Sequence, residues 1–351
     1  MKSTSISDNS YPLPLVYTLS AAERMEIEKL LSEMTKRYST IERDDVALAC
    51  EIASSKLPHD LLNVLRSIAS GYTKSSHLLI KGFEVDDTRI GDSPLHWDAP
   101  WDSVNYLREE MFQMLVSSAI GGVFGWRTQE NGRFLRHIVP IEAVKNEQLG
   151  GSSATTLLWH KEEAFHPGRA DFFTLMCYRN SERATTNISC VDDIEISPED
   201  YTILHQERFL IKSDKSHTPV ENNSEYWKMN SEAFSIIQDM MDNPQPVALL
   251  YGGPRLKMMR VDQAFACSLP GDEEANRALN ALHDALDTAA IHLVMEPGDI
   301  VLLDNLRVAH GRSIYKPNYG PKQRWMRRVN IASGRRANFR LRDSHKLRVM
   351  L

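Results

Sequence analysis

The chain has 351 residues, of which 42% are hydrophobic and 25% are charged, a composition typical of ordinary globular proteins. Its formal net charge of −6 argues against nucleic acid or an anionic membrane surface as the main partner. No apolar run is long enough to span a bilayer, and the N-terminal stretch MKSTSISDNSYPLP lacks an apolar signal core. We therefore expect a cytoplasmic protein of one domain, 1–351, with reduced cysteines.

The first 119 residues have mainly helical patterns. Residues 19–38 predict a helix with Ser20 as its N-cap. Its apolar side chains recur at helical spacing, at Met25, Leu30, Leu31 and Met34. Residues 58–71 and 104–122 predict two further helices, and residues 76–83 predict a buried strand between them.

From about residue 120 onward the apolar segments shorten and alternate, which predicts strands. They cover 134–141, 155–163, 171–179, 185–191, 246–253, 256–262, 291–295, 299–305 and 324–333. Helices are expected near 224–242 and 272–289. The polar stretch 212–232 is either a surface insertion or a lid over an active site. The pattern predicts a β-rich core over 120–335 and a short tail over 336–351.

The segment LLWHKEEAFHPGRADF (157–172) places His160 and Glu162 two residues apart on a predicted strand. Alternate side chains of a strand share a face, so these two would point one way and Lys161 the other. Two histidines and one carboxylate on one face of an octahedron suit a non-haem Fe(II) oxygenase. A His-x-Glu pair also occurs by chance on solvated strands, so a third ligand is required. Glu163 and His166 lie at or beyond the strand end and are not expected to join the site.

The best third ligand is His310, which follows a predicted buried strand in EPGDIVLLDNLRVAHGRSIY (296–315). Arg324 and Arg328 come next in QRWMRRVN and, four residues apart on a strand, would share one face. Two arginines inside a barrel are costly unless they meet anions, and guanidinium groups suit carboxylates. A dicarboxylate cosubstrate and an amino acid would supply two such anions. A basic surface strand is the alternative interpretation.

The stretches WHKEEAFHPGRADFFTLMCYRN, DNLRVAHGR and QRWMRRVN together resemble the clavaminate synthase-like Fe(II)/2-oxoglutarate oxygenases. The resemblance covers residues 120–335 and is to the branch that hydroxylates free amino acids, including arginine and lysine hydroxylases. It implies an α+β fold, with a double-stranded β-helix (jelly-roll) core flanked by N-terminal and inserted helices. It also implies Fe(II) as cofactor, 2-oxoglutarate and O2 as cosubstrates, and hydroxylation of an unactivated carbon with release of succinate and CO2.

The resemblance also implies roles for particular residues. The iron ligands would be His160, Glu162 and His310. The intact carboxylate of Glu162 favours hydroxylation over halogenation. Arg324 would bind the far carboxylate of 2-oxoglutarate, and Thr186 would add a hydroxyl, although Thr185 fits nearly as well.

Substrate contacts follow from the same resemblance. Arg328 would bind the amino acid's carboxylate, and Gln129, in GWRTQENGR, would contact its α-amino group unless it is an exposed loop residue. Asp262, in MMRVDQAF, would hold a cationic side-chain end unless it only caps a turn. Ala264 stands where a second acid would favour a guanidinium. The expected substrate is therefore free L-lysine, hydroxylated at C3 or C4, with L-arginine hydroxylation or desaturation as the alternative.

Two other classes of protein share part of this pattern. A non-catalytic jelly-roll binding protein would not need both a complete iron site and two inward arginines. A zinc hydrolase could use two histidines and a carboxylate but would have no use for Arg324. A free basic amino acid is the expected partner, with no nucleic acid or membrane partner, and nothing in the sequence excludes a homo-oligomer.

Overall fold

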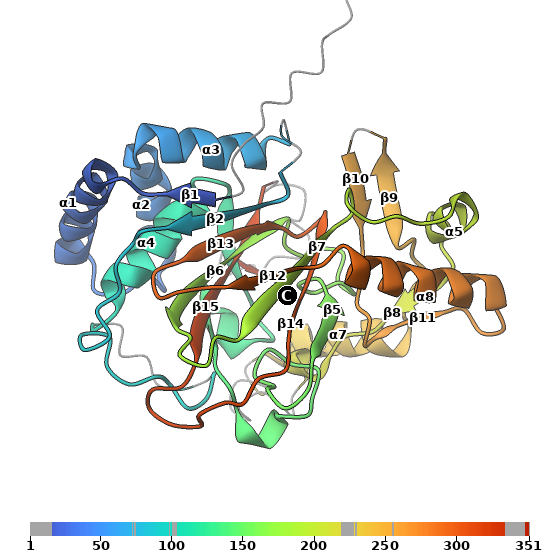
Figure 1. Cartoon of the computed structure of the whole chain (residues 1–351). Coiled ribbons are helices and arrows are strands. Elements are labelled where there is room, and N and C mark those ends of the chain that lie inside the picture. The colour runs from blue at the N-terminus through green and yellow to red at the C-terminus, as the bar shows by residue number, and fades with distance from the viewer. Residues whose placement is uncertain are drawn as a thin grey trace, which may run out of the picture.

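An eight-stranded sheet forms one wall of the fold (Figure 1). The computed structural model describes residues 16–71, 73, 75–97, 99, 104–218, 228, 230–254, 256–333 and 348–350. The strand order is β1-β2-β13-β6-β15-β3-β16, and β4 also pairs with β15. The strands are β1 (Val16–Thr18), β2 (His77–Lys81), β3 (Gly122–Trp126), β4 (Leu135–Ile138), β6 (Phe172–Arg179), β13 (Ile300–Asp304), β15 (Trp325–Ala332) and β16 (Val349–Met350). The β1–β2 and β3–β16 pairs are parallel and the others antiparallel.

A four-stranded antiparallel sheet, ordered β12-β7-β14-β5, forms the opposite wall. Its strands are β5 (Leu157–His160), β7 (Thr185–Cys190), β12 (Ile291–Val294) and β14 (Val308–Arg312). Phe173 and Leu175 of β6 pack with Ile188 of β7 and Val308 of β14, so one apolar core lies between the two sheets. Two facing sheets with this core form the predicted jelly roll.

Helices from the N-terminal part cover the outer face of the larger sheet (Figure 1). They are α1 (Ala21–Arg37), α2 (Asp44–Ala53), α3 (His59–Ala69) and α4 (Leu107–Ser118). Ser20 is the N-cap of α1, as predicted, and Glu23 completes a capping box with it. Of the apolar residues noted at helical spacing, Leu30, Leu31 and Met34 are buried, but Met25 is 74% exposed and Ile27 is buried instead.

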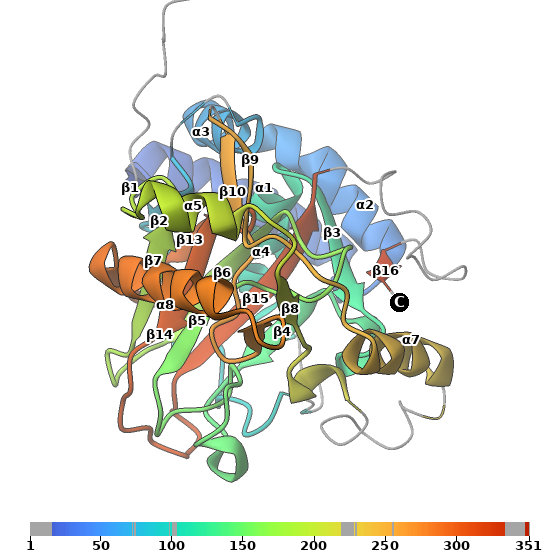
Figure 2. The same ribbon diagram turned by 90° about the vertical axis from the view of Figure 1, so that its right-hand side faces the viewer.

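A second group of elements is inserted between β7 and β12 (Figure 2). They are α5 (Pro198–Leu204), β8 (Phe209–Ile211), α7 (Ser231–Asp242), β9 (Leu250–Gly253), β10 (Leu256–Met259), β11 (Ala266–Ser268) and α8 (Glu273–Thr288). Elsewhere in the chain, short 3₁₀ turns lie at Ser54–Lys56, Glu130–Gly132 and Glu142–Val144, and the insertion contains a fourth at Lys215–His217.

The insertion has its own apolar cluster, which includes Leu204, Phe209 and Leu282 and extends to Trp159 on β5. It therefore packs directly against the strand that carries the His-x-Glu motif.

Several boundaries differ from the sequence predictions. The strand predicted over 155–163 ends at His160, and a turn follows. The helix predicted over 104–122 ends at Ser118, and Gly122 opens strand β3. His310, expected after a strand, lies within strand β14.

Parts of two predicted segments lie outside the described residues. Positions 219–227 and 229 of the 212–232 stretch are among them, as are 334–347 and 351 at the C-terminal end. Within the described residues, none of the helices has the length and apolar character needed to cross a membrane.

Candidate active site

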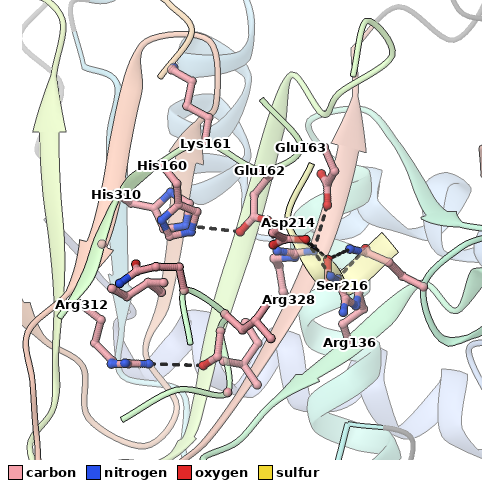
Figure 3. Close-up of a pocket in the computed structure, with 18 of the residues that line it drawn as sticks. Arg136, His160, Lys161, Glu162, Glu163, Asp214, Ser216, His310, Arg312 and Arg328 are labelled. Atoms are coloured by element: carbon pink, nitrogen blue, oxygen red, sulfur yellow. Dashed lines mark hydrogen bonds and ion pairs between the residues drawn. The ribbon is translucent and has the colours of Figure 1, made fainter. Parts of the chain in front are cut away.

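Two histidines from different parts of the chain meet on the smaller sheet. His160 at the end of β5 is the direct antiparallel partner of His310 on β14, and the register shifts immediately beyond this pair. The two imidazole rings lie with their centroids 4.1 Å apart. Figure 3 shows them side by side at the cavity. The strand pairing therefore brings the two predicted histidine ligands together.

Glu162 completes the group. One carboxylate oxygen, Oε1, lies 3.3 Å from Nε2 of His310. One ligand atom from each of His160, Glu162 and His310 can be chosen so that all three lie within 4.8 Å of one another. Lys161 points away from them, as predicted (Figure 3). The predicted reason is wrong, however, because Glu162 lies in the turn after β5 and not on the strand.

The protonation of both histidines fits a metal site. Nδ1 of His160 is 2.8 Å from the carbonyl oxygen of Leu158, to which it can donate, and this leaves Nε2 as a free ligand atom. Burial lowers the pKa of His160 well below its usual value, and burial lowers the pKa of His310 to about 3. Both rings are therefore neutral near pH 7, the state that binds a metal. Two neutral imidazoles and a carboxylate fit Fe(II).

The larger sheet presents two arginines to the same cavity. Arg324, just before β15, and Arg328 on β15 line it, whereas Trp325 and Arg327 are not among the lining residues. Arg327 is fully buried on the other side, where its Nη2 lies 3.1 Å from Oε1 of Glu110 on α4. The orientation predicted from strand alternation is therefore present.

Arg328 is paired with two carboxylates. Its Nη1 donates to Oε2 of Glu162, and its Nη2 lies 3.2 Å from Oε1 of Glu163. The two oxygens of Glu162 thus have different partners, with Oε1 toward His310 and Oε2 toward Arg328. Glu163 was not expected to join the site, but it lines the cavity through this contact.

A second region of the cavity is cationic. Arg324 and Arg312 flank the ring of Tyr315, with guanidinium carbons 5.9 Å and 5.1 Å from its centroid. Among the described residues, no carboxylate lies within ion-pair distance of either arginine. Burial and the nearby Arg324 lower the pKa of Arg312 to about 10. Two buried cations without an anion form a site for a ligand carboxylate. Arg312 was not among the predicted site residues, although it follows His310 by two positions.

The two threonines considered for a hydroxyl near these arginines are placed differently. Thr186 lines the cavity, and its buried side chain lies beside Met295. Thr185 instead donates to Oδ1 of Asn187 at 2.8 Å, on the other face of β7. Of the two threonines, Thr186 is therefore the one placed for a ligand.

Gln129 is a buried cavity residue and not an exposed loop residue. Its Oε1 accepts from Arg136 at 2.5 Å, and its Nε2 donates to Oγ of Ser216 at 2.7 Å. Ser216 in turn donates to Oδ1 of Asp214 at 2.6 Å. Asp214, Ser216 and His217, in the described start (212–218) of the predicted lid, therefore form part of the cavity wall (Figure 3).

Two carboxylates, Asp262 and Asp214, line the cavity from separate segments. Oδ1 of Asp262 accepts backbone N–H groups of Ala264 and Phe265, both at 3.2 Å, so this residue caps a turn as well as facing the cavity. Burial raises the pKa of Asp262, and the charge of Asp214, which lines the same cavity, raises it further. Asp214 was missed because no local sequence pattern links it to Asp262.

The fold and this cavity define a non-haem iron dioxygenase. A profile of the family described as taurine catabolism dioxygenase TauD, TfdA family, matches residues 201–330. Enduracididine beta-hydroxylase of Streptomyces hygroscopicus is 32% identical, over 92% of this chain and 96% of that protein. The L-ornithine/L-arginine 3-hydroxylase of Catenulispora acidiphila is 30% identical, over 91% of this chain and 95% of that protein.

Comparison with solved structures also finds iron oxygenases. The oxygenase OrfP, in complex with Fe, succinate and (3S)-hydroxy-L-Arg, matches with a TM-score of 0.89 and 31% identity, over 97% of this chain and 100% of that one. Another OrfP structure contains Fe and alpha-ketoglutaric acid. The chain therefore belongs to the TauD, TfdA family of dioxygenases. It is an amino-acid hydroxylase that uses iron, 2-oxoglutarate and O2, which confirms the resemblance found in the sequence.

Proposed function

We propose that this enzyme hydroxylates C3 of free L-arginine. The observation that carries the proposal is the pair of cavity carboxylates, Asp214 and Asp262. A guanidinium presents five N–H donors in a fixed plane and gains most from two carboxylate acceptors, whereas one carboxylate can hold a compact ammonium. L-arginine therefore replaces L-lysine as the preferred substrate. The lysine prediction relied on Ala264 in place of a second acid, and Asp214 supplies that acid from another segment.

The relatives support the same choice. One is named for hydroxylation of L-ornithine and L-arginine at position 3, and OrfP is seen with (3S)-hydroxy-L-Arg. Enduracididine beta-hydroxylase is likewise named for the β carbon. These names support both the guanidinium end and C3, which is the β carbon of an amino acid.

In this proposal the iron ligands are His160, Glu162 and His310, whose ligand atoms already lie together. Bound iron, with 2-oxoglutarate and O2, supplies the oxidising chemistry, and the protein supplies orientation and a water-poor cavity. Glu162 would hold the metal through Oε1, which faces His310, while Oε2 is paired with Arg328. The N–H groups of Arg328 that neither Glu162 nor Glu163 uses would bind the amino acid's carboxylate. Gln129 lines the same cavity, and its Oε1, which accepts one bond from Arg136, would accept a second from the α-amino group.

Arg324 and Thr186 bind the far carboxylate of 2-oxoglutarate in this proposal. Both line the cavity, and Arg324 has no carboxylate partner among the described residues. The proximity of Arg312 adds positive charge there and helps to neutralise a dicarboxylate.

The test compares L-arginine with L-citrulline, its neutral isostere, and with L-lysine. Succinate release and a mass increase of one oxygen are measured for the wild type, Asp214→Asn and Asp262→Asn. We expect the wild type to prefer L-arginine over L-citrulline by about 100-fold in kcat/KM, which corresponds to about 2.8 kcal/mol. Each variant should lose about 10-fold or more of this preference, because a cation then faces one carboxylate in place of two.

Asp86→Asn is the matched control for the turn-capping role of Asp262. Oδ1 of Asp86 also accepts two backbone N–H groups two and three residues ahead, at 2.9 Å and 3.1 Å, but it does so in an exposed turn. This variant should keep the wild-type preference. Equal turnover of L-citrulline by the wild type, or faster turnover of L-lysine, would contradict the proposal.

A further inference from the structure

The carboxylate predicted to bind iron is not held by a strand. Strand β5 ends at His160, and beyond it the backbone N–H of Lys161 donates to the carbonyl oxygen of Val261 at 3.0 Å, next to an isolated bridge between His160 and Asp262. Glu162 then lies in a turn, and Glu163 has a left-handed φ of 51°, which is uncommon for a residue other than glycine. A ligand in such a turn requires something other than sheet pairing to fix its position.

Asn305 provides that support. Its Oδ1 accepts the backbone N–H of Glu162 at 3.0 Å, and its Nδ2 donates to the carbonyl oxygen of the same residue at 3.1 Å. The second N–H of the amide is close to the carbonyl oxygen of Ala170, with Nδ2 2.8 Å from that oxygen. Asn305 is fully buried. One side-chain amide therefore bonds both backbone groups of Glu162, as a neighbouring strand would do.

The backbone of Asn305 is fixed as well. Its N–H donates to the carbonyl oxygen of Asp171 at 2.8 Å, and its carbonyl oxygen accepts from Nζ of Lys161 at 2.6 Å. Lys161 is buried on the side opposite His160 and Glu162 (Figure 3). Residues on both sides of the turn are thus hydrogen-bonded to one asparagine. This asparagine lies three positions before the strand that carries His310.

We propose that Asn305 is a positioning residue for the metal site, which sets the carboxylate of Glu162 against His160 and His310. The proposal rests on the proposed assignment of these three residues as iron ligands. Groups that hold metal ligands in place are worth about 10- to 100-fold in metal affinity. Asn305 does this through the backbone of the ligand, so its loss should loosen the carboxylate without removing any ligand atom.

The chain offers a close match for a control. Asn180 is also buried, its Oδ1 accepts the backbone N–H of Ala184 at 3.0 Å, and its Nδ2 lies 3.0 Å from the carbonyl oxygens of Ala184 and Met295. Asn305 and Asn180 thus make the same three kinds of bond. Neither Asn180 nor Ala184 is among the residues that line the cavity. A purely structural loss should be the same for both.

The experiment compares Asn305→Ala and Asn180→Ala with the wild type. Fe(II) is titrated anaerobically into the full chain with 2-oxoglutarate present, and its dissociation constant is read from the visible charge-transfer band. Urea unfolding is measured in parallel. We expect Asn305→Ala to bind Fe(II) about 10- to 100-fold more weakly, and Asn180→Ala to stay within about twofold of the wild type. Both should unfold at similarly reduced urea concentrations.

Three outcomes would overturn the inference. If the two variants bind Fe(II) equally well, Asn305 only stabilises the fold. If the wild type itself fails to bind Fe(II), the proposed iron ligands are wrong and the inference falls with them. If Asn305→Ala does not fold, Asn305→Ser, which keeps one acceptor, is titrated in its place with the same expectation. Failure of both variants to fold while Asn180→Ala folds would show a structural role alone.

Discussion

His160 and His310 are direct partners across two antiparallel strands, with imidazole centroids 4.1 Å apart. The distance between two potential metal ligands is therefore set by backbone hydrogen bonds of the sheet. Glu162 differs, since it reaches the same point from a turn. Loss of one histidine side chain should thus leave the scaffold of the site in place.

The first prediction concerns these histidines. His160→Ala or His310→Ala should abolish Fe(II) binding and turnover while the circular dichroism spectrum stays native, because apolar contacts between the sheets hold the fold. His59→Ala, at an exposed position on α3, is the control and should bind Fe(II) normally. Full activity in either cavity variant would remove the histidines from the metal site.

The second prediction distinguishes the role of Arg324, just before β15, from that of Arg328 on β15. Arg324→Leu should raise the KM for 2-oxoglutarate, and Arg328→Leu should mainly raise the KM for the amino acid. Each loss leaves a ligand carboxylate without its partner and costs about 2–5 kcal/mol in a dry site. Steady-state kinetics with one substrate varied at a time distinguishes them, and each variant serves as the control for the other. Identical effects on both substrates would refute the division of roles.

A third prediction concerns the predicted lid, 212–232. Its described start lines the cavity through Asp214, Ser216 and His217, so ligands should order it. Hydrogen exchange of a peptide covering 212–218 should slow when L-arginine and 2-oxoglutarate bind together. A peptide from β6 should be unaffected. Equal exchange with and without ligands would leave this segment as a fixed wall and not a lid.

The fourth prediction concerns how the free energy of unfolding depends on pH, through a carboxyl group away from the cavity. Burial raises the pKa of the Glu110 carboxyl to about 8, against the opposing charge of Arg327. Since the unfolded carboxyl titrates near 4.5, the folded chain holds an extra proton between these values. The free energy of unfolding should therefore fall as pH rises through this window, by at most about 1.4 kcal/mol per pH unit from this group.

Glu110→Gln tests this linkage, because the amide has the same shape and does not titrate. Urea unfolding midpoints measured across the window should decline less steeply with pH in this variant than in the wild type. If instead the wild type gains stability with rising pH and the variant loses that gain, Glu110 is ionised in the folded chain and paired with Arg327.

The regular parts of the fold were predictable from the sequence. Strand alternation correctly oriented Arg324 and Arg328, although Arg324 lies just before β15 and the register of this strand shifts between Trp325 and Met326. It gave the right direction for Glu162 for the wrong reason, since the strand stops two residues earlier. Helix α2 was missed because it is short and its N-cap, Arg43, offers no capping side chain.

Contacts between distant loops could not be predicted in the same way. Asp214 and Asp262 belong to separate segments, and only the folded insertion brings both to the cavity. Asn305 was visible in the motif DNLRVAHGR, but its hydrogen bonds to Glu162 depend on how two segments meet. Periodicity describes one element at a time, whereas these relationships depend on tertiary packing.

Ser216 is bonded to both Gln129 and Asp214, the residues proposed to contact the α-amino group and the guanidinium. A single residue therefore joins the two proposed substrate contacts in one hydrogen-bonded chain. The cavity would therefore select amino acids by the length of their side chain. An amino acid one methylene shorter could satisfy only one of the two contacts at a time. Discrimination between homologous amino acids would then reside in this serine turn, while the iron ligands stay the same for all of them.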